Sequence, residues 1–147
     1  MMRGEDCELC HSTGGEELWS DRHCRIVRVT GHEGMAFPGF CRVIWQPHVA
    51  EMSDLTEREA SHLMRIVQAV ERTLRQQLTP DKINLASLGN LVPHLHWHVI
   101  PRWHDDSHFP SPIWAAPNRI GTPRIAPPNE ALSVALHQQL LPWSHNP

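Results

Sequence analysis

The chain has 147 residues, the size of one ordinary domain, and 40% of them are hydrophobic, which is enough for a core. Thirteen Lys and Arg residues against sixteen Asp and Glu residues give a net charge of −3, without the excess positive charge that a general nucleic-acid coat protein needs. No apolar run reaches the roughly 18–20 residues that span a bilayer. We therefore expect one domain, residues 1–147, with no nucleic-acid or membrane partner.

Residues 1–23 are polar and turn-rich, and we expect a loop-like lead-in there. The segment has no apolar stretch typical of a secretory signal, so we expect a cytoplasmic, reducing location. Its C-x-x-C pair, Cys7 and Cys10, is then more typical of half a zinc site than of a disulfide, and such a site needs two further ligands. Cys24 and Cys41 lie in apolar segments and are expected to be buried thiols.

Two strands are expected next. Residues 24–29 alternate and are rich in β-branched side chains, and residues 40–46 (FCRVIWQ) form a second apolar run that ends at Pro47. Between them, residues 31–39 contain three glycines and a proline, which favours a connection without regular structure. The two strands are expected to pair in antiparallel fashion.

A long helix follows the second strand. Thr56 and Glu59 have the spacing of a capping box, and Pro80 ends the element. Apolar residues then recur at spacings of three and four, which places them on one helical face. These residues are Leu63, Val67, Val70, Leu74 and Leu78.

The second half of the chain predicts two more strands, over residues 83–88 and 94–100, joined through a turn at Gly89-Asn90. Residues 105–128 are rich in proline yet partly apolar, so we expect a packed arm or lid. Asn129 is expected to cap a short helix that ends at Leu140. The order β-β-α-β-β predicts an α+β fold with an antiparallel sheet.

The segment HLHWHVI, residues 94–100, carries the strongest chemical signal. On a strand, alternate side chains share a face, so three imidazoles would line one surface while the apolar residues between them pack against the helix. The histidines are His94, His96 and His98, and the apolar residues are Leu95, Trp97 and Val99.

Three interpretations of these histidines stay open on spacing alone. They could be three exposed residues of an edge strand. They could also bind a catalytic zinc, for which Asp105 and Asp106 are the nearby carboxylates. Alternatively, one neutral imidazole attacks a substrate through one nitrogen while its other nitrogen donates a proton to a carbonyl.

The sequence HLHWHVIPR resembles the signature of the histidine triad (HIT) superfamily. The likeness extends through INLASLGN, the long helix and the strand pair, over residues 7–104. It is greatest to bacterial members that act as dinucleoside-polyphosphate hydrolases. The resemblance implies an antiparallel sheet of about five strands with one long and one short C-terminal helix. It also implies a homodimer, a nucleotide substrate and nucleotidyl hydrolase or transferase chemistry without a catalytic cofactor.

The resemblance also implies roles for individual residues. His96 would be the nucleophile on an α-phosphorus and form a nucleotidyl-histidine, His98 would contact the phosphate, and His94 would support the site. Asn84 and Asn90 would hold phosphate or ribose, and Arg102 would add charge at the rim. Such a site suits phosphoryl transfer, which needs in-line placement and several donors.

Some members of the superfamily bind a structural zinc, and the corresponding ligands here are Cys7, Cys10, His48 and His94. Two departures concern other positions: Gln46-Pro47 replaces the usual Pro-Lys, and Glu33 is the only acid near the usual ribose-binding position. Eight histidines receive no role, namely His11, His23, His32, His62, His104, His108, His137 and His145. The rival functions are a zinc-dependent hydrolase and a nucleotide-binding protein without catalysis.

Overall fold

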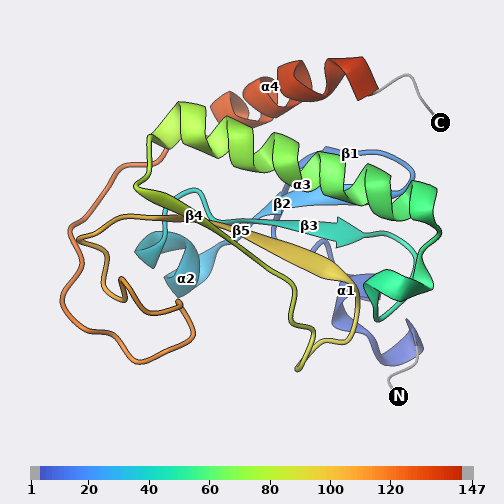
Figure 1. Cartoon of the computed structure of the whole chain (residues 1–147), viewed down its shortest axis with the longest axis horizontal. Coiled ribbons are helices and arrows are strands. Elements are labelled where there is room, and N and C mark those ends of the chain that lie inside the picture. Colours follow the sequence, from blue (N-terminus) through green and yellow to red (C-terminus); the bar gives the residue numbers. More distant parts are fainter. Residues whose placement is uncertain (1–3, 144–147) are drawn as a thin grey trace.

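A computed structural model describes residues 4–143; His145 lies outside this range. Five antiparallel strands form one sheet in the order β1-β2-β3-β5-β4 (Figure 1). This confirms the predicted α+β class and the antiparallel sheet. The strands are β1 (Glu16–Ser20), β2 (Cys24–Arg28), β3 (Cys41–Trp45), β4 (Lys82–Ala86) and β5 (His96–Arg102).

Four helices accompany the sheet within residues 4–143. None of them is both long and apolar enough to cross a membrane. Short 3-10 segments lie at Gly4–Asp6, Met52–Asp54 and Leu141–Trp143. The helices are α1 (Glu8–His11), α2 (Gly31–Ala36), α3 (Glu57–Leu78) and α4 (Asn129–Leu140).

The capping box of α3 is confirmed. The Thr56 hydroxyl accepts a hydrogen bond from the Glu59 amide (3.2 Å), and the Glu59 carboxylate accepts one from the Thr56 amide (2.8 Å). The helix ends at Leu78, and Thr79 caps it in a left-handed conformation (φ 45°), with its amide donating to the Arg75 carbonyl. The predicted apolar residues from Leu63 to Leu74 are buried and Leu78 is half-buried, so this stripe is the face that packs on the sheet.

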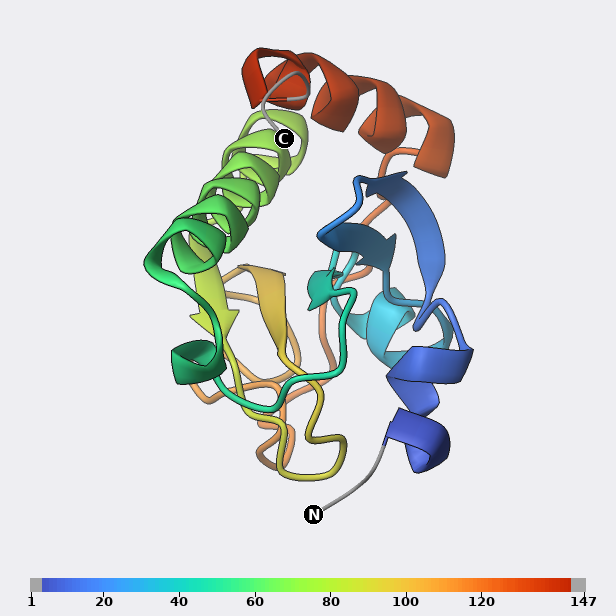
Figure 2. The ribbon, with the colours of Figure 1, turned by 90° about the vertical axis from the view of Figure 1, so that its right-hand side faces the viewer.

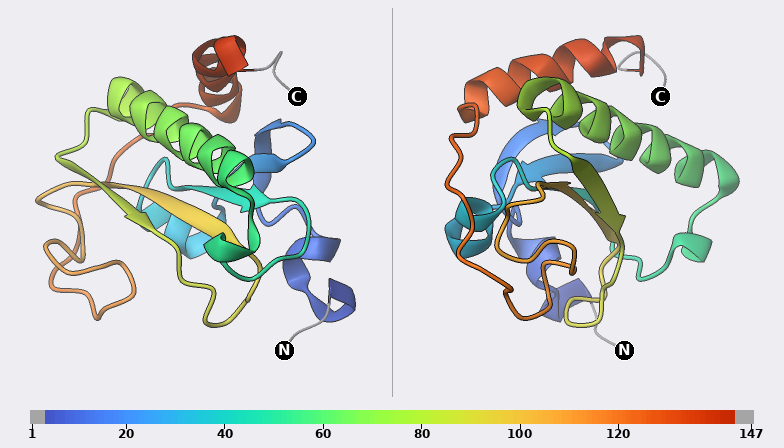
Figure 3. Two further views of the ribbon diagram at one scale, coloured as in Figure 1. Left: turned by 45° about the vertical axis from the view of Figure 1, so that its right-hand side comes forward. Right: turned by 60° about the vertical axis from the view of Figure 1, so that its left-hand side comes forward.

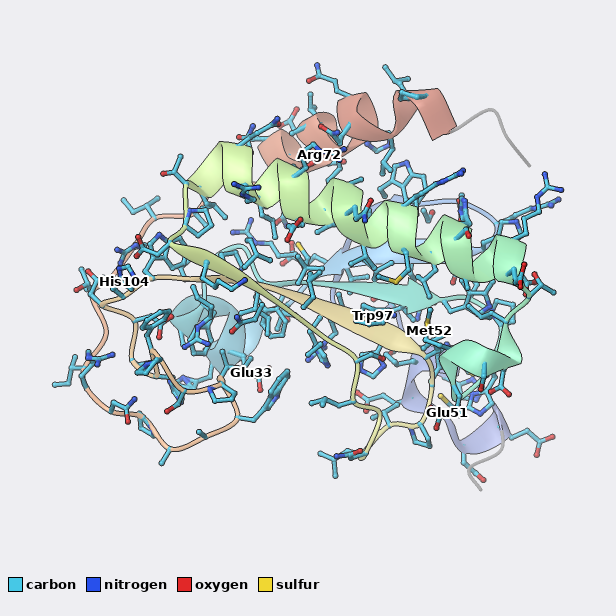
Figure 4. The ribbon with its side chains drawn as sticks, viewed as in Figure 1. Glu33, Glu51, Met52, Arg72, Trp97 and His104 are labelled. Carbon is cyan, nitrogen blue, oxygen red and sulfur yellow. The ribbon has the colours of Figure 1, made fainter. Side chains whose placement is uncertain are left out.

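Helices α3 and α4 lie on one side of the sheet (Figure 2). One face packs on α3 and α4 and forms the main core, to which Val43, Trp45 and Val99 contribute. Trp97 lies on the same face and donates from Nε1 to the Met52 sulfur at 3.4 Å, as their neighbouring labels in Figure 4 indicate. The expectation that the residues between the histidines pack toward the long helix is confirmed. The other face carries His96, His98 and Asn84, together with buried apolar residues such as Ile44 and Ile100.

The lead-in and the first connection contain more regular structure than expected. Residues 16–20 form β1, because Leu18 and Trp19 are buried in the core although their neighbours are polar. Residues 31–36 form the short helix α2. The prediction of irregular structure in these two segments is therefore wrong.

Two predicted boundaries also differ. Strand β5 begins at His96 rather than His94, and it continues through Pro101 to Arg102. The proline is tolerated because it lies past Val99, the last residue paired with β3. Asn129 is the first residue of α4 rather than its cap, and its side-chain oxygen accepts a hydrogen bond from Arg28 (2.8 Å).

Candidate active site

The histidine face of the sheet is set by strand register. His98 lies opposite Arg42 of β3 and Ala86 of β4, and His96 lies opposite Ile44. Directly opposed residues of antiparallel strands project to the same face, so these side chains gather on the side away from α3. The rings of His96 and His98 have centroids 4.9 Å apart, and both residues are buried.

His94 does not join them. It precedes the strand, and its Nε2 donates to the carbonyl of Trp45 at 2.5 Å. Its Nδ1 lies 3.4 Å from the Cys7 sulfur, on the N-terminal side of the molecule. Of the three imidazoles expected on one strand, His96 and His98 lie on β5, and His94 precedes it with its ring turned toward Cys7.

The tautomer of His96 is fixed by its own backbone neighbourhood. Its Nδ1 lies 2.6 Å from the carbonyl oxygen of His94, which can only accept, so Nδ1 carries the proton. The other nitrogen, Nε2, then holds a lone pair. Burial lowers the pKa of His96, and the positive charge of Arg42 lowers it further against the effect of the His94 hydrogen bond. The ring is thus neutral and suited to act as a nucleophile at neutral pH.

His98 is an equally neutral group in an aromatic environment. Its ring contacts Phe40 (centroids 5.7 Å apart) and Trp114 (5.0 Å). Burial, followed by the charges of His96 and Arg42, lowers the pKa of His98 to about 3. Its Nδ1 is buried without a protein partner among the described residues. A buried nitrogen of this kind has a hydrogen bond to offer to a ligand.

Arg102 is not at the rim of the site, which corrects the sequence-based expectation. It is 1% exposed, and its guanidinium forms two hydrogen bonds to Asp106, at 2.8 and 3.1 Å. A third bond runs from Nη1 to the side-chain oxygen of Asn84 at 2.8 Å. This contact turns the Asn84 amide so that its NH₂ group is available to donate. Arg102 therefore positions Asn84.

The two asparagines have different settings. Asn84 lies on β4 opposite Ile100, on the same face as His98, and is half-buried. Asn90 is exposed in the loop between β4 and β5, next to Gly89, whose φ of 73° confirms a sharp turn. The turn predicted at Gly89-Asn90 is present, within a longer connection.

Arg42 is a charged residue of the site for which the sequence predicted no role. It faces His98 across the β3–β5 pair; Nη2 lies 3.7 Å from Glu33 of α2, and Nη1 donates to the carbonyl of Gly14 at 3.3 Å. Its Nε is buried without a partner among the described residues. Figure 4 labels Glu33 beside α2, at this side of the sheet. In the sequence, the arginine within the apolar run FCRVIWQ is the feature that could have indicated a functional side chain here.

A second cluster of side chains, all of them potential metal ligands, includes His94. Cys7, Cys10, His48 and His94 place one ligand atom each within 4.8 Å of all the others. His94 Nδ1 is 3.4 Å from Cys7 Sγ, 3.5 Å from Cys10 Sγ and 3.3 Å from His48 Nδ1. A tetrahedral zinc with bonds of about 2.0–2.3 Å separates its ligand atoms by about 3.3–3.8 Å. The spacing of these atoms fits such an ion.

The tautomer of His94 agrees with this fit. Because Nε2 donates to the Trp45 carbonyl, Nδ1 is left with a lone pair directed at the two sulfurs. By contrast, the groups of potential metal ligands found within residues 4–143 include neither His96 nor His98. Asp106 is occupied by Arg102, and Asp105 by Arg124 at 2.8 Å. The arrangement of donors supports a closed Cys₂His₂ set and not a metal held by the strand histidines.

Several of the histidines without an assigned role have structural partners. His62 lies 2.7 Å from the Asp21 carboxylate, and His23 stacks on Trp45 with centroids 5.5 Å apart. His108 meets Ser107 at 2.7 Å. The first of these contacts joins α3 to the loop between β1 and β2, the second joins that loop to β3, and the third lies within the arm; none of them involves His96.

Curated relatives are similar to parts of the chain. The chain is 35% identical over 78 residues to the AP-4-A phosphorylase of Mycobacterium tuberculosis, which covers 49% of this chain and 40% of that protein. It is 38% identical over 60 residues to the bis(5'-adenosyl)-triphosphatase of Saccharomyces cerevisiae, covering 37% of this chain and 29% of that protein. Each alignment spans less than half of the relative's length.

Solved structures extend the likeness to most of the fold. A histidine triad protein from Bradyrhizobium japonicum superposes with a TM-score of 0.67 at 26% identity, over 86% of this chain and 91% of that one. One from Marinobacter aquaeolei shares the fold, with a TM-score of 0.64 at 23% identity over 92% and 91%. The HIT domain profile matches residues 23–105, more than half of the sequence. On this match, and with the HLHWHVI segment folded as described, the chain belongs to the HIT domain family.

Proposed function

We propose that the protein is a nucleotidyl hydrolase or transferase that cleaves a nucleotide at its α-phosphate through His96. The observation that carries the proposal is the 2.6 Å contact from His96 Nδ1 to the His94 carbonyl, which leaves Nε2 as a fixed, unprotonated nucleophile. The lowered pKa of His96 keeps this form dominant at neutral pH.

The chemistry follows in two steps. His96 Nε2 forms a bond to the α-phosphorus, and the bond from phosphorus to the leaving group breaks, with the electron pair leaving on that group. The imidazole is then cationic, and the His94 carbonyl that accepts from Nδ1 stabilises this charge. Water or another acceptor next attacks the same phosphorus, which releases the nucleotide and restores His96.

The surrounding donors suit the charge that develops on the phosphate. His98 offers a ring nitrogen, and Asn84 offers the amide that Arg102 has oriented. Asn90 would reach the phosphate from the exposed loop. Arg42 would supply the positive charge first expected from Arg102, because it is the arginine that faces His98. Fixed donors of this kind stabilise a phosphoryl transition state without a strong base.

Dinucleoside polyphosphates are the proposed substrate class. Both named curated relatives carry names that refer to such compounds, and the alignment with the first covers 49% of this chain. A phosphate leaving group departs as a stable oxyanion, so the neutral His98 need not act as an acid. A phosphoramidate remains a second class, for which the leaving amine has to obtain a proton from water or substrate.

Burst kinetics with a dinucleoside polyphosphate test this function. Wild type should release leaving group in a burst equal to the enzyme concentration if hydrolysis of the intermediate is slower than its formation. His96→Ala should lower turnover at least about 1,000-fold while AMP still binds. A variant that turns over at the wild-type rate would refute the role of His96. Tight nucleotide binding by wild type without turnover on any such substrate would favour the non-catalytic alternative.

We propose a structural role for zinc. The ion would be held by Cys7, Cys10, His48 and His94, all four positions of a tetrahedron being filled, so it would tie the N-terminal segment to the residue that orients His96. The thiols would have to stay reduced, as in a cytoplasm.

We also propose a homodimer that forms at β4. This strand is at the edge of the sheet, whereas the opposite edge strand, β1, is contacted by α4 through Ser133, which donates to the Leu18 carbonyl at 2.7 Å. Leu85 and Leu88 are 39% and 50% exposed on and beside β4. An open edge with apolar side chains is able to pair with a second copy. Sedimentation should give twice the mass of one chain, and a monomer at micromolar concentration would contradict this.

A further inference from the structure

Trp114 is a large aromatic residue that remains exposed beside His98. The two rings have centroids 5.0 Å apart and are inclined by 69°. Nevertheless, 45% of Trp114 is exposed. The apolar residues that share the histidine face, such as Ile44 and Ile100, are at most 1% exposed, so the Trp114 indole is an accessible apolar surface beside the polar groups of the site. Exposed apolar surface in such a place is typical of ligand contact.

The neighbouring residue shows that the position of Trp114 is fixed. Ile113 is 8% exposed and packs with Phe37, Phe40 and Ile100. The Ala115 amide donates to the carbonyl of Pro112 at 3.1 Å, which closes a turn around the pair. Ile113 therefore anchors the segment and Trp114 is presented outward by it.

The arm around Trp114 is held at several further points. Arg102 donates to the carbonyl of Ser111 at 2.8 Å, and Arg119 donates to the carbonyls of Asp106 and Phe109, both at 2.7 Å. Figure 3 shows the arm, in orange, running beside α2. Because the arm is already ordered, a ligand that meets Trp114 would not have to order it, and less binding free energy would be lost.

We propose that Trp114 stacks on the base of the bound nucleotide and strengthens nucleoside binding. This rests on the proposed function, which places the α-phosphate at His96 and His98; the base is joined to that phosphate through a single ribose. Trp114 lies beyond residues 23–105, so the family match assigns it no part in the site. Every base has a flat π-face, so the contact tolerates different bases.

Equilibrium binding of AMP and of ribose 5-phosphate separates a base contact from a phosphate contact. Trp114→Ala should weaken AMP about 5- to 100-fold and leave ribose 5-phosphate unchanged, whereas Trp114→Phe should retain most of the AMP affinity. Ile120→Ala is the matched control, because Ile120 is 99% exposed in the same arm. It should leave both affinities unchanged.

The proposal is overturned if Trp114→Ala weakens both ligands equally, which would make Trp114 a support for His98, or if it weakens neither. It is also overturned if wild type binds AMP no more tightly than ribose 5-phosphate. The burst experiment with His96→Ala is independent of these outcomes. A Trp114-dependent preference for AMP together with full turnover by His96→Ala would leave the base contact standing and refute the covalent mechanism.

Discussion

The two ends of HLHWHVI look alike in sequence and differ in the structure. At one end, His94 lies before the strand, with its Nδ1 among two sulfurs and a second imidazole. At the other end, His96 and His98 lie on the strand and face away from the core, beside Arg42. One residue joins the two regions, because the His94 ring faces the sulfurs and the His94 carbonyl accepts the hydrogen bond from His96 Nδ1. A regular alternation of one residue type can therefore serve two sites.

Because the two ends have different surroundings, substitutions at each end should affect different properties of the protein. Changes at the His94 end should act first on stability, and changes at the His96 end should act on catalysis.

Removal of the metal ligands should have the largest effect on stability. Cys7→Ser with Cys10→Ser, or treatment of wild type with a chelator, should lower the free energy of unfolding by several kcal/mol, about 4 or more, since a structural zinc binds only the folded chain. Thermal unfolding with and without added zinc measures the change. Cys41→Ser is the control, because this buried thiol lies on the face of the sheet that packs on α3 and outside the cluster; its unfolding should not respond to zinc. No difference between chelated and zinc-loaded wild type would refute the zinc site.

Disruption of the buried ion pair between Arg102 and Asp106 should have the next largest effect on the free energy of unfolding. Asp106→Ala leaves the Arg102 guanidinium buried without its carboxylate and should cost about 3–5 kcal/mol in urea unfolding. Asp105→Ala removes the solvent-accessible pair with Arg124 and should cost much less. Equal costs for the two variants would contradict this assignment.

The same pair predicts a pH dependence of stability. Burial alone would raise the pKa of Asp106, but Arg102 and three backbone amides lower it to about 2, below the value of about 3.9 for an unfolded chain. The stabilisation is therefore complete above pH 4 and is lost as the pH falls from about 4 to 2, by about 2 kcal/mol. Urea unfolding of wild type and Asp106→Asn measures it; the variant should lack this part of the decline.

Neutralising Arg42 should affect catalysis rather than folding. Arg42→Gln should reduce kcat/KM on a dinucleoside polyphosphate about 10- to 100-fold, the size expected for losing one electrostatic contact to the transition state. Arg28→Gln is the matched control, because Arg28 bonds to Pro127 and Asn129, away from the histidines. An equal loss of activity in both variants would show that Arg42 acts only through the fold.

The smallest effect is expected at Ser87, which donates to the carbonyl of His96 at 2.9 Å. Ser87→Ala removes this bond and should lower stability by about 0.5–1.5 kcal/mol, with less than about threefold change in kcat. A loss of kcat comparable with that of Arg42→Gln would give Ser87 a larger role than its backbone contact implies.

Local patterns in the sequence predicted the parts of the fold that local patterns control. The capping box at Thr56, the apolar face of α3 and the alternating strands are correct because each depends on neighbours within a few residues. Strand β1 was missed because Leu18 and Trp19 are its only apolar residues, and their burial depends on α4 from the far end of the chain.

The site was predictable to the extent that strand alternation defines it. His96 and His98 follow from the spacing, whereas the turn of His94 toward Cys7 depends on how residues 87–95 connect β4 to β5. Arg42 becomes visible only through the register of β3 against β5. Trp114 becomes visible only when the arm is placed beside α2, which no spacing in the sequence encodes.

The location of the covalent intermediate decides whether His96 is the nucleophile. Wild type mixed with a dinucleoside polyphosphate should be quenched in alkali, where a nucleotidyl-histidine survives, and digested for mass analysis. We expect one nucleotide per chain on His96, lost on brief treatment with acid. A nucleotide on His94 or His98, or rapid turnover without any adduct under conditions that give a burst, would contradict it.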